Sequence, residues 1–163
     1  LKGIIADKKI RCISSDDSPE HHTFHAENLI KALELQSKKV LVVDVSNTLK
    51  DIRAEHYINF SDDENLKLTS AEIHHIILEK LKNTDICIVN NQAMRQGKMP
   101  LLFLKIADQN LFLLDSRKTA IKSIMNVELI KDEFKIENLW FVLNKVGYNP
   151  SIFSTLKKLI QKK

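Results

Sequence analysis

Short runs of apolar residues alternate along the chain with longer segments in which apolar residues recur every three or four positions. Continuous runs such as 39–45 and 85–89 are typical of parallel strands that are covered on both faces. The helical spacing within 71–81 is typical of a helix that buries one face. The pattern predicts strands at 9–13, 39–45, 57–60, 85–89, 110–114 and 139–143, and helices at 23–35, 71–81, 99–107, 120–134 and 152–160.

This alternation predicts one α/β domain that spans residues 1–163, with helices on both faces of a mostly parallel sheet. Parallel strands end at the same edge of a sheet, and open sheets of this kind bind ligands there. The candidate chemistry therefore lies in the segments that follow the strands. These segments are 14–23, 44–47, 90–93, 115–119 and 144–148.

Glycine is scarce in this chain, which contains only Gly3, Gly97 and Gly147. Segment 14–23 contains none, and this excludes an ordinary glycine-rich phosphate loop or a G-x-G-x-x-G turn.

The chain has 25 lysine and arginine residues and 21 acidic residues. The excess of four equals the number of lysines in residues 151–163, which contain no acid. The rest of the chain is therefore neutral, and we expect no nucleic-acid partner, since such a surface needs clustered basic residues.

Cys12 and Cys87 lie within predicted strands, so we expect two buried thiols and no disulfide.

Five histidines lie in two short segments: His21, His22, His25, His74 and His75. Structural zinc takes four ligands that usually include cysteine, and neither cysteine has a ligand-like spacing. We therefore expect solvated loop histidines and no metal site.

The polar segments at the predicted strand ends resemble, in their order, the bacterial tyrosine kinase (BY-kinase) domain of exopolysaccharide and capsule autokinases. That family has a serine pair, a P-G-E-G-K-[ST] phosphate loop, a strand ending in D-x-D, a strand followed by D-T-P-P, and later strands that end near G-K-T and L-N-x-V. The matching segments here are 13–15, 19–23, 38–44, 85–93, 106–119 and 139–146. The resemblance implies a three-layer P-loop NTPase-like fold, with ATP and Mg²⁺ serving tyrosine autophosphorylation in the family.

The same resemblance implies a cellular setting. The family's domain lies at the cytoplasmic face of the bacterial inner membrane, so we expect a membrane tether in a segment upstream of Leu1. Its partners would be proteins of the polysaccharide synthesis and export machinery, and a homo-oligomer is a further expectation. The family phosphorylates a C-terminal tyrosine cluster, whereas the tyrosines here are Tyr57 and Tyr148.

The family's phosphate loop is changed in this chain. Pro19, Glu20, His21, His22 and Thr23 align with G-E-G-K-[ST], so both glycines are missing. His22 replaces the lysine that holds the transferring phosphate. Thr23 keeps the hydroxyl that would bind Mg²⁺, although a threonine at this place is also a common helix cap.

Two of three acids near the family's metal are replaced as well. Asp44 remains, Ser46 stands at the second acid of D-x-D, and Asn90 stands at the later acid. Mg²⁺ prefers carboxylate and phosphate oxygens, so its affinity should fall. Asp44 is then either a structural hydrogen-bond partner or a remaining metal ligand. Asn144 stands where the family contacts the base.

These changes favour a catalytically impaired tyrosine-kinase-like domain that acts in assembly or regulation of an exopolysaccharide protein, without ATP or Mg²⁺. Two alternatives stay open. An active divergent autokinase or ATPase would need His22 or a lysine such as Lys118 at the phosphate. A partition-type ATPase relative would share the fold but would also need a lysine-bearing loop.

Overall fold

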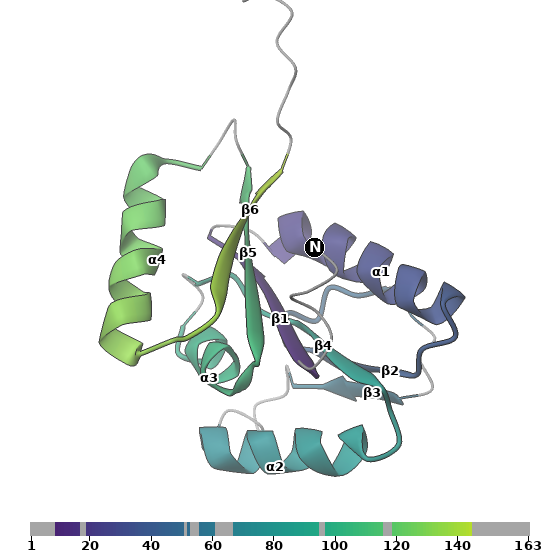
Figure 1. Ribbon diagram of the computed structural model, residues 1–163. Helices are drawn as coiled ribbons and strands as arrows, with labels where there is room; N and C mark the ends of the chain where they lie inside the picture. The colour runs from purple at the N-terminus through teal and green to yellow at the C-terminus, as the bar shows by residue number, and fades with distance from the viewer. Residues whose placement is uncertain are drawn as a thin grey trace, which may run out of the picture.

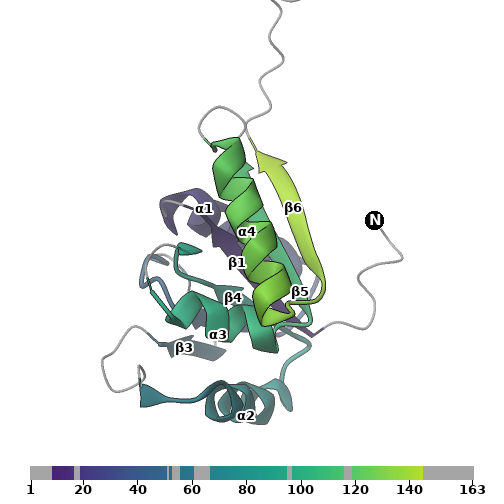
Figure 2. The ribbon, with the colours of Figure 1, turned by 90° about the vertical axis from the view of Figure 1, so that its left-hand side faces the viewer.

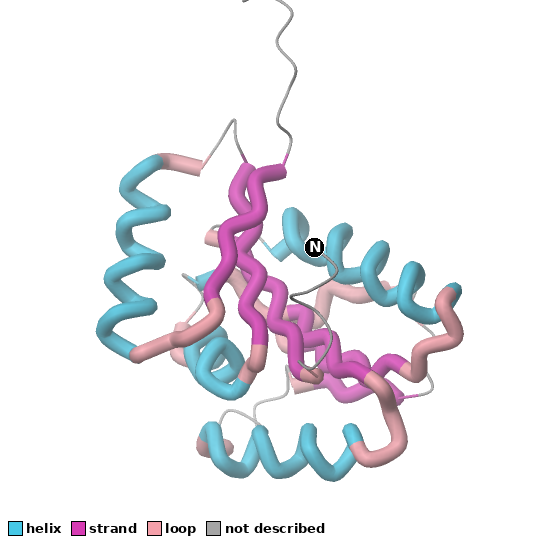
Figure 3. Tube along the Cα trace, viewed as in Figure 1, coloured by secondary structure: helices cyan, strands magenta, loops and turns pink. Residues whose placement is uncertain are grey.

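The computed structural model describes residues 9–16, 19–50, 52, 56–60, 67–94, 97–115 and 119–144, of which 19–21 by their backbone only. Six strands and four helices lie in these ranges (Figures 1 and 3). The strands are β1 (Ile10–Ser15), β2 (Val40–Asp44), β3 (His56–Asn59), β4 (Ile86–Asn90), β5 (Gln109–Asp115) and β6 (Leu139–Asn144). The helices are α1 (Pro19–Leu35), α2 (Ser70–Leu81), α3 (Met99–Ile106) and α4 (Ile121–Phe134).

All six strands run parallel in one sheet, in the order β3-β2-β4-β1-β5-β6. The first strand therefore lies in the middle of the sheet, with β4 on one side and β5 on the other. The chain order reverses at this point, because β2 and β3 lie beyond β4 while β6 lies beyond β5. Such a switch point leaves a crevice at the carboxyl ends of the strands, where open α/β sheets bind ligands.

Helix α1 covers one face of the central strands (Figure 1). On this face Val42 and Ile88 form a buried cluster with Ala26 and Ile30 of α1, and all four are 0% exposed. Leu113 of β5 belongs to the same cluster. Because the central strands are covered on both faces, their sequences are apolar at successive positions.

The other three helices lie on the opposite face, and Figure 2 shows α4 in front of β5 with α3 and α2 below it. Leu41 and Cys87 belong to a buried cluster with Ile73 and Ile77 of α2 and Phe103 of α3. A smaller cluster joins α4 to β5 and contains Val127, Phe112 and Leu114. The molecule therefore has the predicted three layers, with helices on both faces of the sheet.

Two aspartates hold the amino ends of neighbouring strands. Asp108 Oδ2 accepts hydrogen bonds from the backbone N–H groups of Lys9 and Ile10, at 3.1 and 2.9 Å. Asp85 Oδ2 accepts one from the backbone N–H of Lys39 at 2.8 Å. Each carboxylate therefore accepts hydrogen bonds from backbone N–H groups at the start of β1 or β2, where these groups have no partner in the neighbouring strand.

The predicted fold class and elements are confirmed, with element bounds shifted by at most four residues. The largest shift is at α1, which begins at Pro19, so residues 19–23 belong to the first turns of a helix and not to a loop. Cys12 and Cys87 are buried free thiols, as expected, and burial raises the pKa of the Cys12 thiol to about 12. The predicted helix at 152–160 lies outside the described residues.

Helix α2 begins with a capping box of Thr69 and Glu72. The N–H of Glu72 donates to Thr69 Oγ1 at 3.3 Å, and the N–H of Thr69 donates to Glu72 Oε2 at 2.7 Å. We expect Thr69→Ala to lower the free energy of unfolding by about 1 kcal/mol, as measured by urea denaturation, because one amide loses its acceptor. Thr69→Ser keeps the hydroxyl and should stay close to wild type, so equal losses in the two variants would contradict the cap.

Candidate functional site

The carboxyl ends of β2 and β4 carry Asp44 and Asn90, which are register partners in adjacent strands. Both side chains are 0% exposed. Buried polar atoms need hydrogen-bond partners, and here they find them in the start of α1 and in the turn after β2. Thr23, Asp44, Ser46, Thr48 and Asn90 meet at this place, and we call these five residues the polar cluster.

Asp44 is the acceptor at the centre of the polar cluster. Its Oδ1 accepts hydrogen bonds from Asn90 Nδ2 and Ser46 Oγ, both at 3.0 Å. Its Oδ2 accepts from the backbone N–H of Leu49 at 3.0 Å and from the Tyr57 hydroxyl at 3.1 Å. Four donors therefore surround the two carboxylate oxygens and offset the cost of burying this group.

The side-chain amide of Asn90 lies among four oxygens. Its Nδ2 is 2.7 Å from Ser46 Oγ, 3.0 Å from Asp44 Oδ1, 3.1 Å from Thr48 Oγ1 and 3.4 Å from Thr23 Oγ1. An ionised carboxylate only accepts, so the amide nitrogen, and not the amide oxygen, faces Asp44. Asn90 Oδ1 is buried and has no hydrogen-bond partner among the described residues.

The three hydroxyl groups of the polar cluster form a chain that joins α1 to the turn after β2. Ser46 Oγ lies 2.6 Å from Thr48 Oγ1, and Thr48 Oγ1 lies 2.5 Å from Thr23 Oγ1. Thr23 is 8% exposed. Its hydroxyl, which aligns with the Mg²⁺ ligand of the kinases, is therefore engaged with Thr48. Thr48 lies in a polar stretch that no periodicity marks, so the sequence carries no signal for it.

His22 lies on the side of α1 that faces the sheet and is 0% exposed. Its Nε2 is 2.5 Å from the backbone oxygen of Asn91, and its Nδ1 is 2.7 Å from Ser15 Oγ. A carbonyl oxygen only accepts, so Nε2 carries a proton. The expectation of a solvated loop histidine is wrong for His22. Because α1 begins earlier than predicted, at Pro19, this position is part of a helix and points inward.

Asn91 lies in the candidate segment 90–93, and the structure gives it a structural role that the sequence did not assign to it. It is 0% exposed. Its Nδ2 donates to Ser14 Oγ at 3.0 Å and to the backbone oxygen of Pro100 at 3.1 Å. Its own N–H donates to the backbone oxygen of Ile13 at 3.0 Å. Asn91 therefore ties the ends of β4 and β1 to the start of α3, and its carbonyl also holds His22.

Asn144, which aligns with the base contact of the kinases, lies away from the polar cluster. It ends β6, and strands β1 and β5 separate it from β4. Its Nδ2 is 2.7 Å from Nε2 of His25, which must be the acceptor because an amide nitrogen only donates. This contact links the edge strand to α1. The side chains of Pro19, Glu20 and His21 lie outside the described part of the structure.

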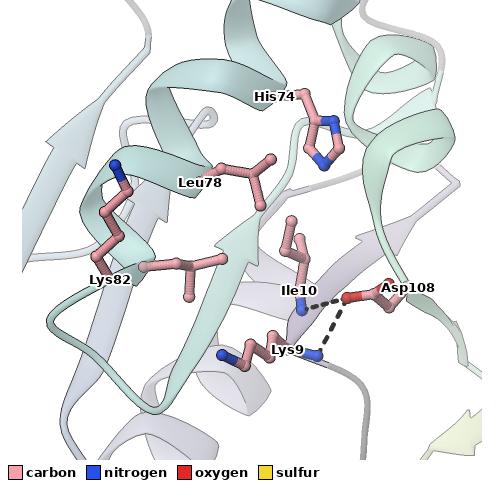
Figure 4. Close-up of a pocket in the computed structure, with 7 residues that line it drawn as sticks. Lys9, Ile10, His74, Leu78, Lys82 and Asp108 are labelled. Atoms are coloured by element: carbon pink, nitrogen blue, oxygen red, sulfur yellow. Dashed lines mark hydrogen bonds between the residues drawn. The ribbon is translucent and has the colours of Figure 1, made fainter.

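Two of the pockets among the described residues lie at opposite ends of the strands. One of about 300 Å³ opens beside the polar cluster and is lined by Thr23, Phe24, Glu27, Asn47, Thr48 and Lys50. The other, of about 340 Å³, lies beside α2 at the amino ends of the strands (Figure 4). His74 and Leu78 of α2 line it together with Ile10 and Asp108, and the dashed lines mark the bonds from Asp108 to the chain at Lys9 and Ile10. The first pocket lies between the start of α1 and the turn after β2.

Within the described ranges, no three His, Cys, Asp or Glu side chains are grouped so that they could hold a metal ion. His74 and His75 lie on α2, within the helix predicted at 71–81, so the expectation of loop histidines is wrong for them. Among the helices that the structure describes, none is both long and apolar enough to cross a membrane.

The parallel sheet, its strand order and its crevice define a fold of the P-loop NTPase class. Solved structures with this fold include the kinase domain of the Escherichia coli tyrosine kinase ETK, at 13% identity and a TM-score of 0.69 over 88% of this chain and 70% of that chain. A ParA family ATPase from Chlorobium tepidum is 16% identical, with a TM-score of 0.67 over 94% and 81%. The MinD cell division protein of Aquifex aeolicus is 17% identical, with a TM-score of 0.65 over 90% and 73%.

No protein-family model and no curated protein sequence matches this chain. At identities of 13–17%, the structural likeness establishes the fold. The resemblance to the BY-kinase domain that the strand-end motifs predicted is confirmed at that level, and the same fold is shared by ATPases of the ParA and MinD kind.

Tyr57 provides a spectroscopic test of the polar cluster. Burial, and after it the charge and hydrogen bond of Asp44, raise the pKa of Tyr57 from 10.0 to about 12. An unfolded tyrosine ionises near pH 10, so the stability that this shift contributes is complete below about pH 10 and is lost as the pH rises through about 12. In rapid pH-jump absorbance titrations, Tyr57→Phe should remove the later phenolate transition. A folded Tyr57 that ionises like the denatured chain would contradict the contact with Asp44.

The substitution Asn90→Asp would set a second carboxylate beside Asp44 in a buried site. Two adjacent buried carboxyl groups cannot both ionise, so one pKa is raised and the variant recovers stability as the pH falls. We expect a loss of about 3 kcal/mol in the free energy of unfolding near pH 7. Asn90→Leu removes the same donor without adding a charge, so its loss should change less with pH than that of Asn90→Asp. Urea denaturation at neutral and mildly acidic pH distinguishes the two variants. If the free energy of unfolding depended on pH equally in both, the side chains at positions 44 and 90 would not be close together.

Proposed function

We propose that this chain is a tyrosine-kinase-like domain of an exopolysaccharide biosynthesis or export protein that does not transfer phosphate and acts in assembly or regulation. It would work at the cytoplasmic face of the bacterial inner membrane, tethered through a segment upstream. The proposal rests on one observation, which is that the polar groups of the polar cluster form hydrogen bonds with groups of this chain. Both oxygens of Asp44 and the hydroxyl of Thr23 are engaged by this chain's own side chains and backbone.

The residues at these positions do not fit Mg²⁺ and ATP. Mg²⁺ requires near-octahedral oxygen ligands, usually carboxylates and phosphates. Asp44 already has four donors around its two oxygens, and Asn90 turns an amide nitrogen toward it. His22 is buried with both ring nitrogens engaged, so it cannot replace a lysine at a phosphate group. Binding Mg²⁺·ATP would first require these hydrogen bonds to break.

A role in assembly is supported by the outer surface of α4. Ile121, Met125 and Leu129 follow one another at intervals of four residues and are 77%, 59% and 65% exposed. Residues four apart lie on the same side of a helix, so these side chains form one apolar stripe. Exposed apolar patches of this kind mark protein–protein contact sites. A protein of the polysaccharide synthesis and export machinery is the partner that we propose for this stripe.

One observation favours a second candidate, a divergent active kinase or ATPase. The pocket beside Thr23 contains the cation Lys50, which could stand near a phosphate in place of the missing lysine. Its volume of about 300 Å³ is at the lower limit for ligand pockets. In this candidate Lys50 must supply the positive charge at the phosphate group, because no residue at the aligned loop position can supply it.

Titration calorimetry with Mg²⁺·ATP distinguishes the two candidates. We expect no saturable heat at micromolar protein, and no labelled phosphate on the protein after incubation with radiolabelled ATP, because the polar cluster is occupied by hydrogen bonds. Lys50→Met, which removes a cation from the neighbouring pocket, should behave like wild type. Micromolar, Mg²⁺-dependent binding that is lost in Lys50→Met would overturn the proposal and support the divergent enzyme.

A further inference from the structure

Strand β6 is an outer strand of the sheet and exposes apolar side chains on both of its faces. Trp140 and Val142 lie on the face of α1, and Phe141 and Leu143 lie on the face of α4, because their register partners in β5 belong to the clusters under these helices. In chain order, residues 140–143 are 45%, 38%, 37% and 56% exposed. We call these four residues the β6 edge. An occupant that covers both faces must lie alongside the strand.

The backbone of β6 also directs hydrogen-bonding groups away from the sheet. The N–H of Asn110 donates to the backbone oxygen of Asn138 at 2.9 Å, and this bond fixes the pattern between β5 and β6. Alternate residues of a strand face the same neighbour, so Leu139, Phe141 and Leu143 turn their N–H and C=O groups away from β5. Among the described strands, none lies beyond β6. These groups can therefore pair with a strand that is added there.

The two outer strands of the sheet differ in how they are protected. Strand β3, at the other side, has four residues and carries His56 and Asn59 at its ends. Strand β6 has six residues, and its sequence LWFVLN contains no charge and no proline. Natural sheets protect their outer strands by shortness, charged side chains or proline, and a strand without these features pairs readily with another.

Two β6 strands in antiparallel orientation match each other in sequence. If Phe141 of each copy lies on a two-fold axis, Phe141 faces its own equivalent, Trp140 faces Val142 and Leu139 faces Leu143 of the second copy. Residues that are directly opposite in an antiparallel pair lie on the same face, so each contact joins two apolar side chains. Moving the axis by one residue in either direction would set Trp140 or Val142 opposite an asparagine.

We propose that two copies of this chain associate by antiparallel pairing of their β6 strands about a two-fold axis at Phe141. The outward backbone groups of Leu139, Phe141 and Leu143 would form the hydrogen bonds, and the β6 edge of each copy would pack against the other on both faces. A second copy fits this place because an uncharged strand whose residues match in reverse order is complementary to itself, as a two-fold interface requires. The association uses a surface away from the crevice and does not depend on the proposed function.

Sedimentation velocity of the full chain tests the association. One strand from each copy forms a contact smaller than the about 800 Å² per partner of a stable complex, so we expect the dimer fraction of wild type to rise over the micromolar range. Phe141→Lys sets two lysines against each other on the axis and should leave the chain monomeric where wild type is mainly dimeric. Met125→Lys adds the same charge to the apolar stripe of α4 and should keep the dimer. Circular dichroism checks that both variants keep the fold.

Cysteine cross-linking tests the register independently of these lysine variants. Cys12 and Cys87 are buried. Directly opposite residues that exchange hydrogen bonds have Cα atoms about 5.5 Å apart, which suits a disulfide, so Phe141→Cys should give a covalent dimer on mild oxidation with diamide. Leu143→Cys lies two residues from the axis, and its two thiols would be more than about 13 Å apart and should stay reduced.

Three results would overturn this proposal. The first is a wild-type chain that stays monomeric up to its solubility limit, because another part of the chain or a different partner would then cover the β6 edge. The second is a dimer that Phe141→Lys and Met125→Lys change equally, which would place the contact elsewhere. The third is cross-linking that is no faster in Phe141→Cys than in Leu143→Cys, and this result decides the matter if Phe141→Lys fails to fold.

Discussion

The buried carboxylate of Asp44 is the constraint around which the carboxyl edge of the sheet is organised. A carboxylate without solvent must receive hydrogen bonds, and removing donors from such a group costs several kcal/mol. Asn90 is placed opposite by the register of β2 and β4, and Ser46 and Leu49 are placed by the turn after β2. Tyr57 reaches the same carboxylate from β3. One group therefore fixes the relative positions of three strands and a turn.

The start of α1 is held by a second set of buried hydrogen bonds. His22 connects the helix to Ser15 at the end of β1 and to the backbone of Asn91 after β4. Thr23, the next residue, connects the helix to Thr48. A flexible loop that wraps a phosphate needs backbone amides free of such contacts and glycines that allow unusual conformations. In this chain the side-chain hydrogen bonds of His22 and Thr23 hold the start of α1 instead.

Most of the fold could be predicted because it depends on apolar periodicity. The run at 40–44 has no polar interruption before its final aspartate, and this is sufficient to identify a strand with two covered faces. Periodicity places the start of α1 too late because Pro19, Glu20 and His21 carry no apolar pattern, although proline in the first turn is a helix signal. The contacts of Thr48 and Asn91 could not be predicted, since they depend on which strands become neighbours and on a turn whose backbone the sequence does not determine locally.

The differences between this chain and the kinase motif that it resembles would have a common physical reason if, as proposed, the crevice holds no nucleotide. Neighbouring acids at the ends of β2 and β4 are stable only while a cation compensates them, and without one they repel each other in a buried site. Replacing one of them by Asn90 turns that repulsion into a hydrogen bond to Asp44. A buried lysine at position 22 would likewise lack a partner without a phosphate, whereas His22 can be neutral and bond to Ser15 and Asn91. The proposed absence of a nucleotide would therefore account for both the histidine at position 22 and the asparagine at position 90.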